Sequence, residues 1–469
     1  MPGLRLHSMA EQRCCCMPSQ PANDHGRSRG FEDGGQEYDT EKAKTAPSEH
    51  CKPIGFGVRY WSPGRSKRKS QAHMSHPLQG VRILELGQII AGTYGGQVLS
   101  DLGAEVIKIE SPKGDLGRNA SVAPYRGLSG LFLTFNRNKK SVVIDLKTDA
   151  GRGIFYDLVK LSDVVIDNFR PGVLERLQID YQTLSRINPR IIQCSVTGFG
   201  MTGSYKDYPA LDLSIQAIAG HMAVTGEPGR PPARVGIPLG DLSGGIFAMQ
   251  SVLTALFDRE RTGRGSQIDI SMFDAMLHLL TYMGTMWLTN GELPKPSGSA
   301  HDYTVPWQAF AASDGYLVVA AREPATWVRL CEVLGEPELA FDPRFATAED
   351  RVKNRGILVP HLEAIFRTRT VAEWLECLRA ADLSVAPVNH FDKAFAEAPV
   401  AEREMIVEYD HPDVGKVRLP GNPIKMSGMA AKPSTPAPRL GEHTDAVLGQ
   451  LLSLSADEIA SLRQQGAIG

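Results

Sequence analysis

Short runs rich in valine and isoleucine alternate with stretches of helical periodicity between residues 80 and 195. Turn residues flank each run, which is typical of β-strands. Strands that alternate with helices favour a mostly parallel sheet with helices on both faces, because a parallel connection needs a crossover. We therefore expect an α/β fold. The expected strands are residues 81–86, 105–110, 141–146, 163–167 and 190–195, and the expected helices include residues 151–161 and 183–186.

A dinucleotide-binding motif is one interpretation of the glycines that follow the first strand. Residues 92–96 read GTYGG, and Glu110 ends the second expected strand. The dinucleotide motif spaces its glycines as GxGxxG, however, and the bulky run QII at 88–90 occupies the turn. We therefore expect a Rossmann-type fold that does not bind NAD, with its ligand at the carboxyl ends of the strands.

Composition narrows the class of protein. A chain of 469 residues is long enough for two or more domains, and its formal net charge of -2 argues against a nucleic-acid partner. We expect no apolar run long enough to cross a membrane. The seven cysteines include no CxxC pair of the zinc-binding type. The simplest expectation is a cytoplasmic protein with no metal and no membrane partner.

Residues 1–73 differ in composition from the rest of the chain. They are rich in Gly, Pro, Ser, Lys and Arg and have little apolar periodicity. The run MSHPLQG at 74–80 reads like a natural start. We interpret residues 1–73 as a disordered N-terminal extension, or as a segment wrongly included in the reading frame. A targeting or lipidated segment at residues 14–16, which are all cysteine, is the alternative.

One carboxylate lies in a glycine-rich run just ahead of an apolar stretch. The run GIPLGDLSGG at 236–245 places Asp241 between glycines, and the apolar stretch 246–256 is expected to form a buried helix. Glycines let another molecule approach closely, and a helix N-terminus stabilises negative charge. Asp241 is therefore a candidate reactive carboxylate, with a helix N-cap as the alternative role.

Many short motifs follow one another in a particular order over residues 77–469. They are VRILELG (81–87), AG (91–92), DLGAEVIKIE (101–110), NRNKKS (136–141), DLK (145–147), DNFRPG (167–172), SVTGFG (195–200), PALD (209–212), GD (240–241), TGRG (262–265) and PRLGEH (438–443). No single motif is specific, but their order and spacing together resemble the class III CoA-transferases. That family includes formyl-CoA and carnitine CoA-transferases, with the alpha-methylacyl-CoA racemases as relatives.

The resemblance implies an architecture. Residues 74–296 would begin a large Rossmann-like CoA-binding domain, residues 297–390 would form a smaller α+β domain, and residues 391–469 would return to the large domain and end in a helix. Strands are expected near 307–311 and 315–321, helices near 324–334 and 370–381, and a capping box at 455–458. Two such chains interlock in the family, so the resemblance implies an interlocked homodimer.

The resemblance also assigns chemistry to two carboxylates. Asp241 matches the family's nucleophile, which attacks a thioester and forms a mixed anhydride and then an aspartyl-CoA thioester. A covalent route of this kind divides a difficult transfer into easier steps. Asp212 matches a catalytic aspartate of the racemases and an Asp or Glu of the transferases, with a helix N-cap as the alternative role. His221 is interpreted as a core residue.

Acyl-CoA and a carboxylic acid are the implied substrates. The resemblance places Gln88, Ala91, Ile144, Lys147, Asn168, Phe169, Arg176 and Gly240 around CoA. Arginine suits phosphate because its guanidinium stays charged and donates in a fork. Without the resemblance, Lys147 would be interpreted as a solvated surface residue. Ile90, Glu110 and the glycine-poor run 297–300 depart from formyl-CoA transferase, so formyl and oxalyl specificity are not implied.

Two other functions fit part of the pattern. An acyl-CoA racemase or epimerase would use Asp212 as an acid or base beside the alpha carbon. A CoA-binding protein without turnover would use the same pocket as a sensor. The Gly240-Asp241 pair favours CoA transfer over both, and the sequence leaves the identity of the two acids open.

Overall fold

The computed structural model describes residues 76–121, 123–429 and 434–469. The interpretations of residues 1–73, including the cysteines at 14–16, lie outside these described residues.

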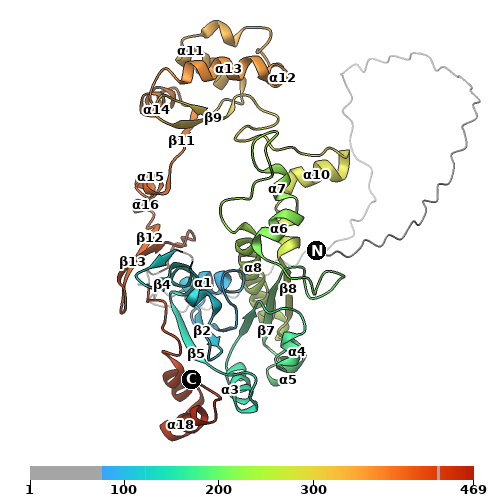
Figure 1. The fold of residues 1–469 in the computed structure, drawn as a ribbon, viewed down its shortest axis with the longest axis vertical. Coiled ribbons are helices and arrows are strands. Elements are labelled where there is room, and N and C mark those ends of the chain that lie inside the picture. Colours follow the sequence, from blue (N-terminus) through green and yellow to red (C-terminus); the bar gives the residue numbers. More distant parts are fainter. Residues whose placement is uncertain (1–75, 122, 430–433) are drawn as a thin grey trace, which may run out of the picture. The chain divides into compact units, whose positions relative to one another are not determined.

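A six-stranded, fully parallel sheet forms the centre of the first part of the described chain (Figure 1). In sheet order its strands are β5 (Lys139–Val143), β2 (Glu105–Glu110), β1 (Arg82–Glu85), β6 (Val164–Asp167), β7 (Ile192–Thr197) and β8 (Gln267–Ser271). This sheet, with its crossover helices, confirms the α/β fold. The expected interlocked homodimer stays a prediction.

The strand order reverses next to β1. The chain runs outward from β1 through β2 to β5, and then returns to the other side of β1 with β6, followed by β7 and β8. Ligands of open parallel sheets bind beyond the carboxyl ends of the strands at such a reversal. The segments that leave these ends are residues 86–90 after β1 and the turn that begins at Asn168 after β6. The topology therefore points to these two segments as the edge of a binding site.

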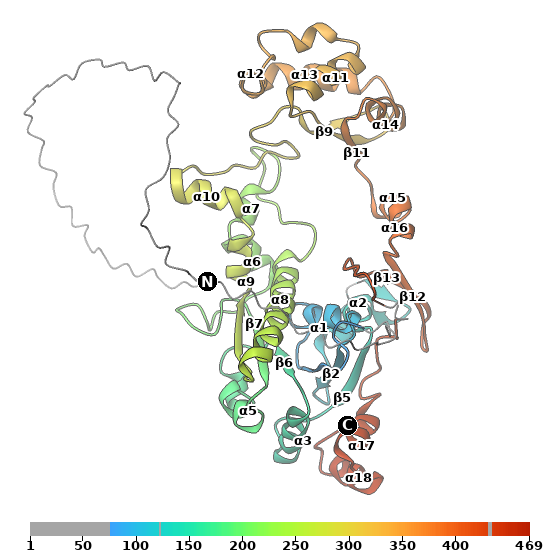
Figure 2. The same cartoon turned by 180° about the vertical axis from the view of Figure 1, so that it is seen from behind.

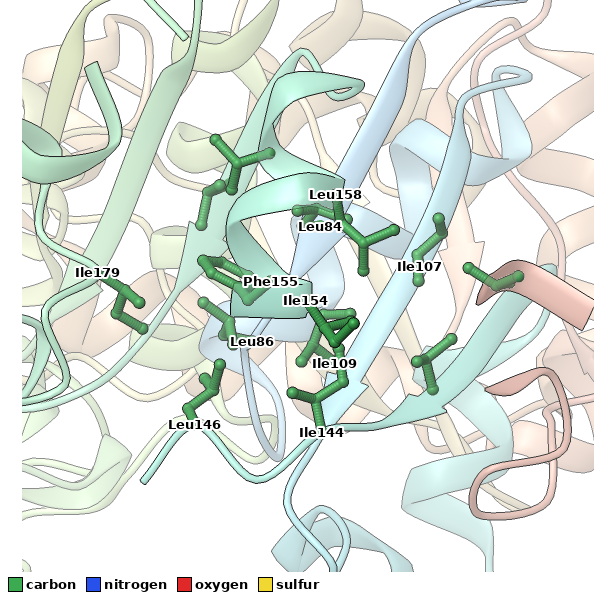
Figure 3. Packing of buried hydrophobic residues seen from close by; sticks show 14 of the residues in the cluster. Leu84, Leu86, Ile107, Ile109, Ile144, Leu146, Ile154, Phe155, Leu158 and Ile179 are labelled. Carbon is green, nitrogen blue, oxygen red and sulfur yellow. The ribbon is translucent and has the colours of Figure 1, made fainter. Parts of the chain in front are cut away.

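Successive residues of the central strands enter two different hydrophobic cores. Ile83 packs in one core and Leu84 in the other, because neighbouring side chains of a strand point to opposite faces. Figure 3 shows one of these cores, in which Phe155 of α3 (Asp149–Lys160) packs over Leu84. Full burial of a side chain such as Phe155 contributes about 1.5–3 kcal/mol. These apolar contacts hold α3 on this face of the sheet.

On the opposite face, α1 (Ala91–Asp101) and α8 (Leu239–Thr262) pack closely against each other. A Cβ added to Gly95 would lie 2.9 Å from the Gly245 carbonyl oxygen, and one added to Gly245 would lie 2.9 Å from Cβ of Tyr94. Only glycines permit so close an approach. The contact fixes α8 against the helix that follows the β1 turn.

The helix α8 is long and apolar enough, by length and composition alone, to cross a membrane, and it is the one such helix among the described residues. The expectation that no apolar run reaches this length is therefore wrong. Core helices of soluble proteins meet the same criteria. Within the structure α8 packs against α1, β7 and α9 (Met272–His278).

Residues 305–383 contain a separate hydrophobic core around an antiparallel sheet (Figure 2). Its elements are β9 (Trp307–Ala311), β10 (Tyr316–Ala320), β11 (Ser384–Pro387), α11 (Pro324–Leu334), α12 (Ala348–Lys353), α13 (Arg355–Phe366) and α14 (Val371–Ala380). The expected strands and helices of this region are present. The proposed boundaries at 297 and 390 stay a prediction.

The C-terminal residues return to the parallel sheet. The Val143 amide donates to Thr444 Oγ1 at 3.1 Å, and Ile144 forms an isolated antiparallel bridge with Ile468. Helices α17 (Thr444–Leu452) and α18 (Ala456–Gln464) add Val447, Leu448 and Ile459 to the core beneath α3. The Ser455 capping box opens α18 as expected.

Strand boundaries differ from the expected ones in identifiable ways. The expected strand 141–146 is β5 at 139–143, and Ile144 follows it with a hydrogen bond to the Glu110 carbonyl oxygen at 2.9 Å and an isolated bridge to Ile468. The edge strand β8 was missed, because its sequence QIDIS alternates polar residues with apolar ones. The remaining elements are η1 (Leu116–Asn119), β3 (Pro124–Tyr125), β4 (Leu128–Ser129), α2 (Gly130–Asn136), α4 (Val173–Arg176), α5 (Tyr181–Ile187), α6 (Asp212–Ile218), α7 (His221–Val224), α10 (Thr281–Asn290), η2 (Pro337–Ala340), α15 (Phe391–Ala394), α16 (Ala398–Glu402), β12 (Ile406–His411) and β13 (Gly415–Pro420).

Candidate active site

Asp241 lies in the first turn of α8. The residue that caps this helix is Pro238, which makes no side-chain hydrogen bond, so Asp241 is not the N-cap. Its carboxylate has no hydrogen bond or ion pair within residues 76–121, 123–429 and 434–469. Burial, followed by the negative charge of Asp212, raises the pKa of Asp241 to about 7. Asp241 therefore remains a candidate reactive carboxylate.

Asp212 is bonded to the start of the same helix. Its Oδ1 accepts the Gly240 amide at 2.7 Å and the Asp241 amide at 3.4 Å, and its Oδ2 accepts Gln216 Nε2 at 2.8 Å. Asp212 is the first residue of α6, after the capping residue Leu211. The N-cap interpretation of Asp212 is therefore replaced by a different role, because its carboxylate satisfies amides of α8. The Asp212 carboxylate therefore lies against the backbone that carries Asp241.

Gly240 permits this contact. A Cβ on Gly240 would lie 3.1 Å from Asp212 Oδ1, closer than most side-chain contacts allow. The glycine thus lets the Asp212 carboxylate reach the amides of the first turn. Gly240 supports the carboxylate pair, and it does not line either of the two cavities described next.

A cavity of about 220 Å³ contains both carboxylates. It lies at the carboxyl ends of β1, β6 and β7, which is where the strand order predicts a ligand. Of the residues assigned to CoA from sequence, its wall contains Gln88, Ala91, Asn168 and Phe169.

A second cavity, of about 500 Å³, adjoins the first. Gln88 and Phe169 line both cavities, so the two meet at these residues. The larger cavity contains Ile144, Lys147 and Arg176. The structure therefore gathers all the sequence-predicted CoA residues except Gly240 around two adjacent cavities.

The turns that separate the cavities are held by side chains. Asn168 accepts the Gln88 amide through Oδ1 and donates to the Gln88 carbonyl through Nδ2, both at 2.9 Å. Asp167 is buried behind them, where it accepts Ser195 Oγ at 2.8 Å and the Phe169 amide at 3.2 Å. Burial raises the pKa of Asp167 to about 7. The β1 and β6 turns are thus bonded to each other at the boundary of the cavities.

A buried ionic network supports the β1 turn from below, and sequence reasoning missed it. Lys108 Nζ lies 2.8 Å from Asp115 Oδ2, 3.4 Å from Glu85 Oε1 and 2.7 Å from the Gly87 carbonyl oxygen. Asp115 Oδ1 accepts the Ile89 amide at 3.1 Å. The charged residues Glu85 and Lys108 within otherwise apolar strands were the available signal, because a buried charge needs a partner.

The network holds Ile89 in an unusual conformation. Ile89 has φ of 65°, in the left-handed region that β-branched residues rarely adopt. Such a conformation costs on the order of 1–3 kcal/mol and persists only where surrounding contacts impose it. The Asp115 hydrogen bond to the Ile89 amide is one such contact. The turn between the cavities is therefore shaped by Asp115.

The pKa values of the carboxylates Asp115 and Glu110 are shifted in the opposite direction from the pKa of Asp241. Burial alone would raise the pKa of Asp115, but the charge and hydrogen bond of Lys108, together with the Gly117 and Ile89 amides, outweigh burial and hold the pKa below its usual value. Glu110 behaves in the same way, because Arg118 donates to it through Nη2 at 2.6 Å and Nε at 2.7 Å. Burial lowers the pKa of Lys139, which pairs with Glu85 at 2.7 Å, to about 8.

Other candidate residues are placed more simply. His221 is half-buried, and its Nε2 lies 2.9 Å from the Met276 carbonyl oxygen, outside the residues that line the two cavities. In the described part of the chain, no group of three or more His, Cys, Asp or Glu side chains is arranged to hold a metal ion.

Comparison with known proteins agrees with this arrangement. The family model "CoA-transferase family III" matches residues 78–444. Acetyl-CoA:oxalate CoA-transferase of Acetobacter aceti is 40% identical over 375 residues, which covers 79% of this chain and 95% of that protein. Succinyl-CoA:glutarate CoA-transferase of Mus musculus is 35% identical over 426 residues, which covers 88% of this chain and 98% of that protein.

A solved structure has the same fold. A CAIB/BAIF family protein from Brucella suis superposes with a TM-score of 0.73 at 37% sequence identity, covering 80% of this chain and 99% of that one. Sequence, fold and the family model agree over most of the described residues. The chain belongs to CoA-transferase family III, and it is a CoA-transferase.

Proposed function

We propose that this protein transfers CoA from an acyl-CoA to a carboxylic acid through a covalent intermediate on Asp241. The observation that carries the proposal is the position of Asp241. Its carboxylate has no partner among the described residues and lines the smaller cavity, which meets the larger cavity at Gln88 and Phe169. A thioester held at this junction would face the carboxylate, with the rest of CoA in the larger cavity.

The chemistry proceeds by four acyl transfers. Asp241 attacks the thioester carbonyl, the C–S bond breaks, and a mixed anhydride and CoA thiolate form. The thiolate attacks the aspartyl carbonyl carbon, which releases the first acid and leaves an aspartyl-CoA thioester. The acceptor carboxylate attacks this thioester and expels the thiolate again. The thiolate then attacks the acceptor's acyl carbon, which frees Asp241 and the new acyl-CoA.

The raised pKa of Asp241 suits the first step. A carboxylate whose conjugate acid is weaker is the better nucleophile, provided that it is ionised at the working pH. With a pKa of about 7, Asp241 is partly ionised near neutrality and more basic than an ordinary aspartate. The position of Asp241 in the first turn of α8 gives the ionised form a favourable helix dipole.

The larger cavity fits the nucleotide part of CoA. Lys147 and Arg176 line it, and neither side chain is in an ion pair with a described residue. Free cations at a cavity wall match the phosphates of CoA. Gln88 and Phe169 would then border the pantetheine where it enters the smaller cavity.

The substrate acids are inferred from the relatives. The relatives described above are named for acetyl-CoA with oxalate and for succinyl-CoA with glutarate, so each name contains at least one dicarboxylic acid. We infer the same class of acid for this chain. The racemase alternative is not favoured, because these relatives are named transferases.

A trapping experiment tests the proposal. The protein is incubated with an acyl-CoA and hydroxylamine without an acceptor, and its peptides are analysed by mass spectrometry. Transfer through an aspartyl intermediate gives a hydroxamate at Asp241. A racemase would instead exchange the alpha proton of the acyl-CoA with solvent and leave Asp241 unmodified, which would refute the covalent mechanism.

A further inference from the structure

We propose that Lys206 binds the second carboxylate of a dicarboxylic acid in the cavity that contains Asp241. The inference rests on the proposed transfer function and adds to it the residue that selects the acid. Lys206 lies in the loop between β7 and α6 and lines this cavity together with Asp212 and Asp241.

The charge of the cavity creates the need for a cation. Its wall contains two carboxylates, Asp241 and Asp212. A dicarboxylate keeps one carboxylate ionised while the other reacts, and this remaining charge would be repelled by Asp212. Among the described residues that line the cavity, the cationic ones are Arg170 and Lys206. These two side chains are therefore the candidates among the described lining residues for an ion pair with the second carboxylate.

Lys206 is available for such a bond. Within residues 76–121, 123–429 and 434–469, its ammonium has no ion pair and no hydrogen bond to a side chain. The buried lysines of the same sheet differ, because Lys108 and Lys139 are both paired with Glu85. Lys206 is exposed, so it can be left without a partner until a ligand arrives.

The loop that carries Lys206 is anchored by aromatic side chains on both sides of it. Tyr205 and Tyr208 stack with a centroid separation of 4.6 Å, and both pack edge-on against Phe199 at 5.6 and 6.4 Å. The Phe199 ring in turn contacts Phe273 at 5.9 Å. Aromatic pairs in stacked and edge-on geometries attract each other beyond the effect of the area that they bury. The loop is therefore built to present Lys206 in a defined place.

Arg170 is the less suitable of the two cations for this role. It directly follows Phe169, which lines both cavities, so it lies on the boundary towards the proposed CoA space. Lys206 instead lies in the segment that leads to Asp212. Like Arg170, it lines the smaller cavity and not the larger one. Arg170 is therefore a matched control, because it is a cation in the same cavity with a different expected partner.

The size of the cavity agrees with a small acid. At about 220 Å³ it is below the range of about 300–1,000 Å³ that is typical of drug-sized ligands. An acid of a few carbon atoms, with one carboxylate near Asp241 and the other near Lys206, is the class of ligand that matches this size and charge.

Isotope exchange with two acids of similar size provides the test. Labelled glutarate is exchanged into glutaryl-CoA, and labelled butyrate into butyryl-CoA, by the wild-type protein and by Lys206→Met, Lys206→Arg and Arg170→Met. Exchange of an acid into its own thioester requires no knowledge of the natural donor. Lys206→Met should raise KM for glutarate roughly tenfold, which is the loss expected for one hydrogen bond to a charged group. Butyrate should be unaffected.

The controls separate selection of the acid from general damage. Lys206→Arg should keep the wild-type KM for glutarate, since it retains the charge, and Arg170→Met should affect both acids alike. Equal effects of Lys206→Met on both acids, or a glutarate-specific loss in Arg170→Met, would overturn the assignment. A wild-type protein that exchanges butyrate and not glutarate would also overturn it, while leaving the transfer function intact. No exchange with either acid, together with no hydroxamate at Asp241, would refute the transfer function itself.

Discussion

Two groups of carboxylates in the same region of the sheet have pKa values that their surroundings shift in opposite directions. Asp241 lies in the first turn of α8 without a cation, beside another carboxylate, and its pKa is raised to about 7. Asp115 and Glu110 are more deeply buried than the half-buried Asp241, yet each is paired with a cation, and their pKa values are lowered. The difference is what the proposed mechanism requires of Asp241, while the ion pairs of Asp115 and Glu110 stabilise the fold.

The two groups also act on the same turn from different sides. Asp115 supports the turn at Ile89 from within the sheet, and Asp241 lines the cavity on which that turn borders. A buried charge without a partner costs folding free energy, so the protein is expected to be less stable for having Asp241. Replacing an aspartate by asparagine in each group should therefore have opposite consequences.

The largest expected effect is on activity at the unpaired carboxylate. Asp241→Asn keeps the shape of the side chain and removes the nucleophile, so CoA transfer should fall by roughly 10⁴-fold or more. The measurement is kcat for transfer, with CoA binding followed separately to show that the site is intact. Asp115→Asn is the comparison and should retain measurable turnover. A kcat for Asp241→Asn above about a tenth of the wild-type value, with deamidation excluded, would sink the nucleophile assignment.

The next largest effect is on the free energy of unfolding. We expect it to change in opposite directions in Asp115→Asn and Asp241→Asn. Asp115→Asn leaves Lys108 buried without its closest partner and should lower the free energy of unfolding by about 3 kcal/mol. The folded-state pKa of Asp115 is depressed, so its contribution is present above the unfolded pKa of about 4 and is lost as the pH falls through the folded value. Urea unfolding at pH 8 measures the change.

Asp241→Asn should raise stability at the same pH. The folded-state pKa of Asp241 is raised, so ionisation destabilises the protein as the pH rises from about 4 to about 7, and the full cost is present above 7. The gain in Asp241→Asn should be about 1–2 kcal/mol at pH 8 and should vanish near pH 4. Two variants that shift stability in the same direction at pH 8 would show that the pairing difference has no energetic consequence.

A smaller effect is expected on the pH dependence of kcat/KM for the acyl-CoA. If the ionised Asp241 is the nucleophile, kcat/KM for the acyl-CoA should rise with pH through a midpoint of about 7. The charge of Asp212 contributes to this midpoint after burial, so Asp212→Asn should move it down by about one unit or less. An unchanged midpoint in Asp212→Asn would mean that the two carboxylates are not electrostatically coupled.

The smallest effect is expected at the far end of the proposed CoA site. Arg176→Ala removes a cation that lines the larger cavity and should raise KM for acyl-CoA roughly fivefold while leaving kcat unchanged. Such a pattern is typical of a contact shared by the ground state and the transition state. A fall in kcat at constant KM would place Arg176 near the reacting centre and reverse the proposed orientation of CoA.

The parts of the molecule that follow from local pattern were predictable from sequence. The Val- and Ile-rich strands are buried on both faces, so β1, β2, β6 and β7 stand out against their polar flanks. The polar edge strand β8 does not stand out in this way, because one of its edges faces solvent instead of another strand. The capping box at Ser455 could also be predicted from the sequence, since it depends on residues three positions apart.

The candidate site was only partly predictable, because its contacts join residues that are far apart in the sequence. The bond from Asp212 to the Gly240 amide spans 28 positions, and the bond from Asn168 to Gln88 spans 80. No local pattern fixes which residues such contacts join. Asp115 gave even less signal, because its role depends on Lys108 being buried and on the left-handed turn at Ile89.

The central claim is that Asp241 becomes covalently bonded in every turnover, and transfer of oxygen tests it most directly. In the proposed mechanism the bridging oxygen of the second anhydride comes from the acceptor acid and stays on the aspartate when the thiolate attacks the acyl carbon. An acceptor labelled with oxygen-18 in its carboxylates should therefore place the label in the side chain of Asp241 after turnover, detected by mass spectrometry of the peptide. The peptides that contain Asp115 and Glu110 should stay unlabelled. Complete CoA transfer without label in Asp241 would contradict the account.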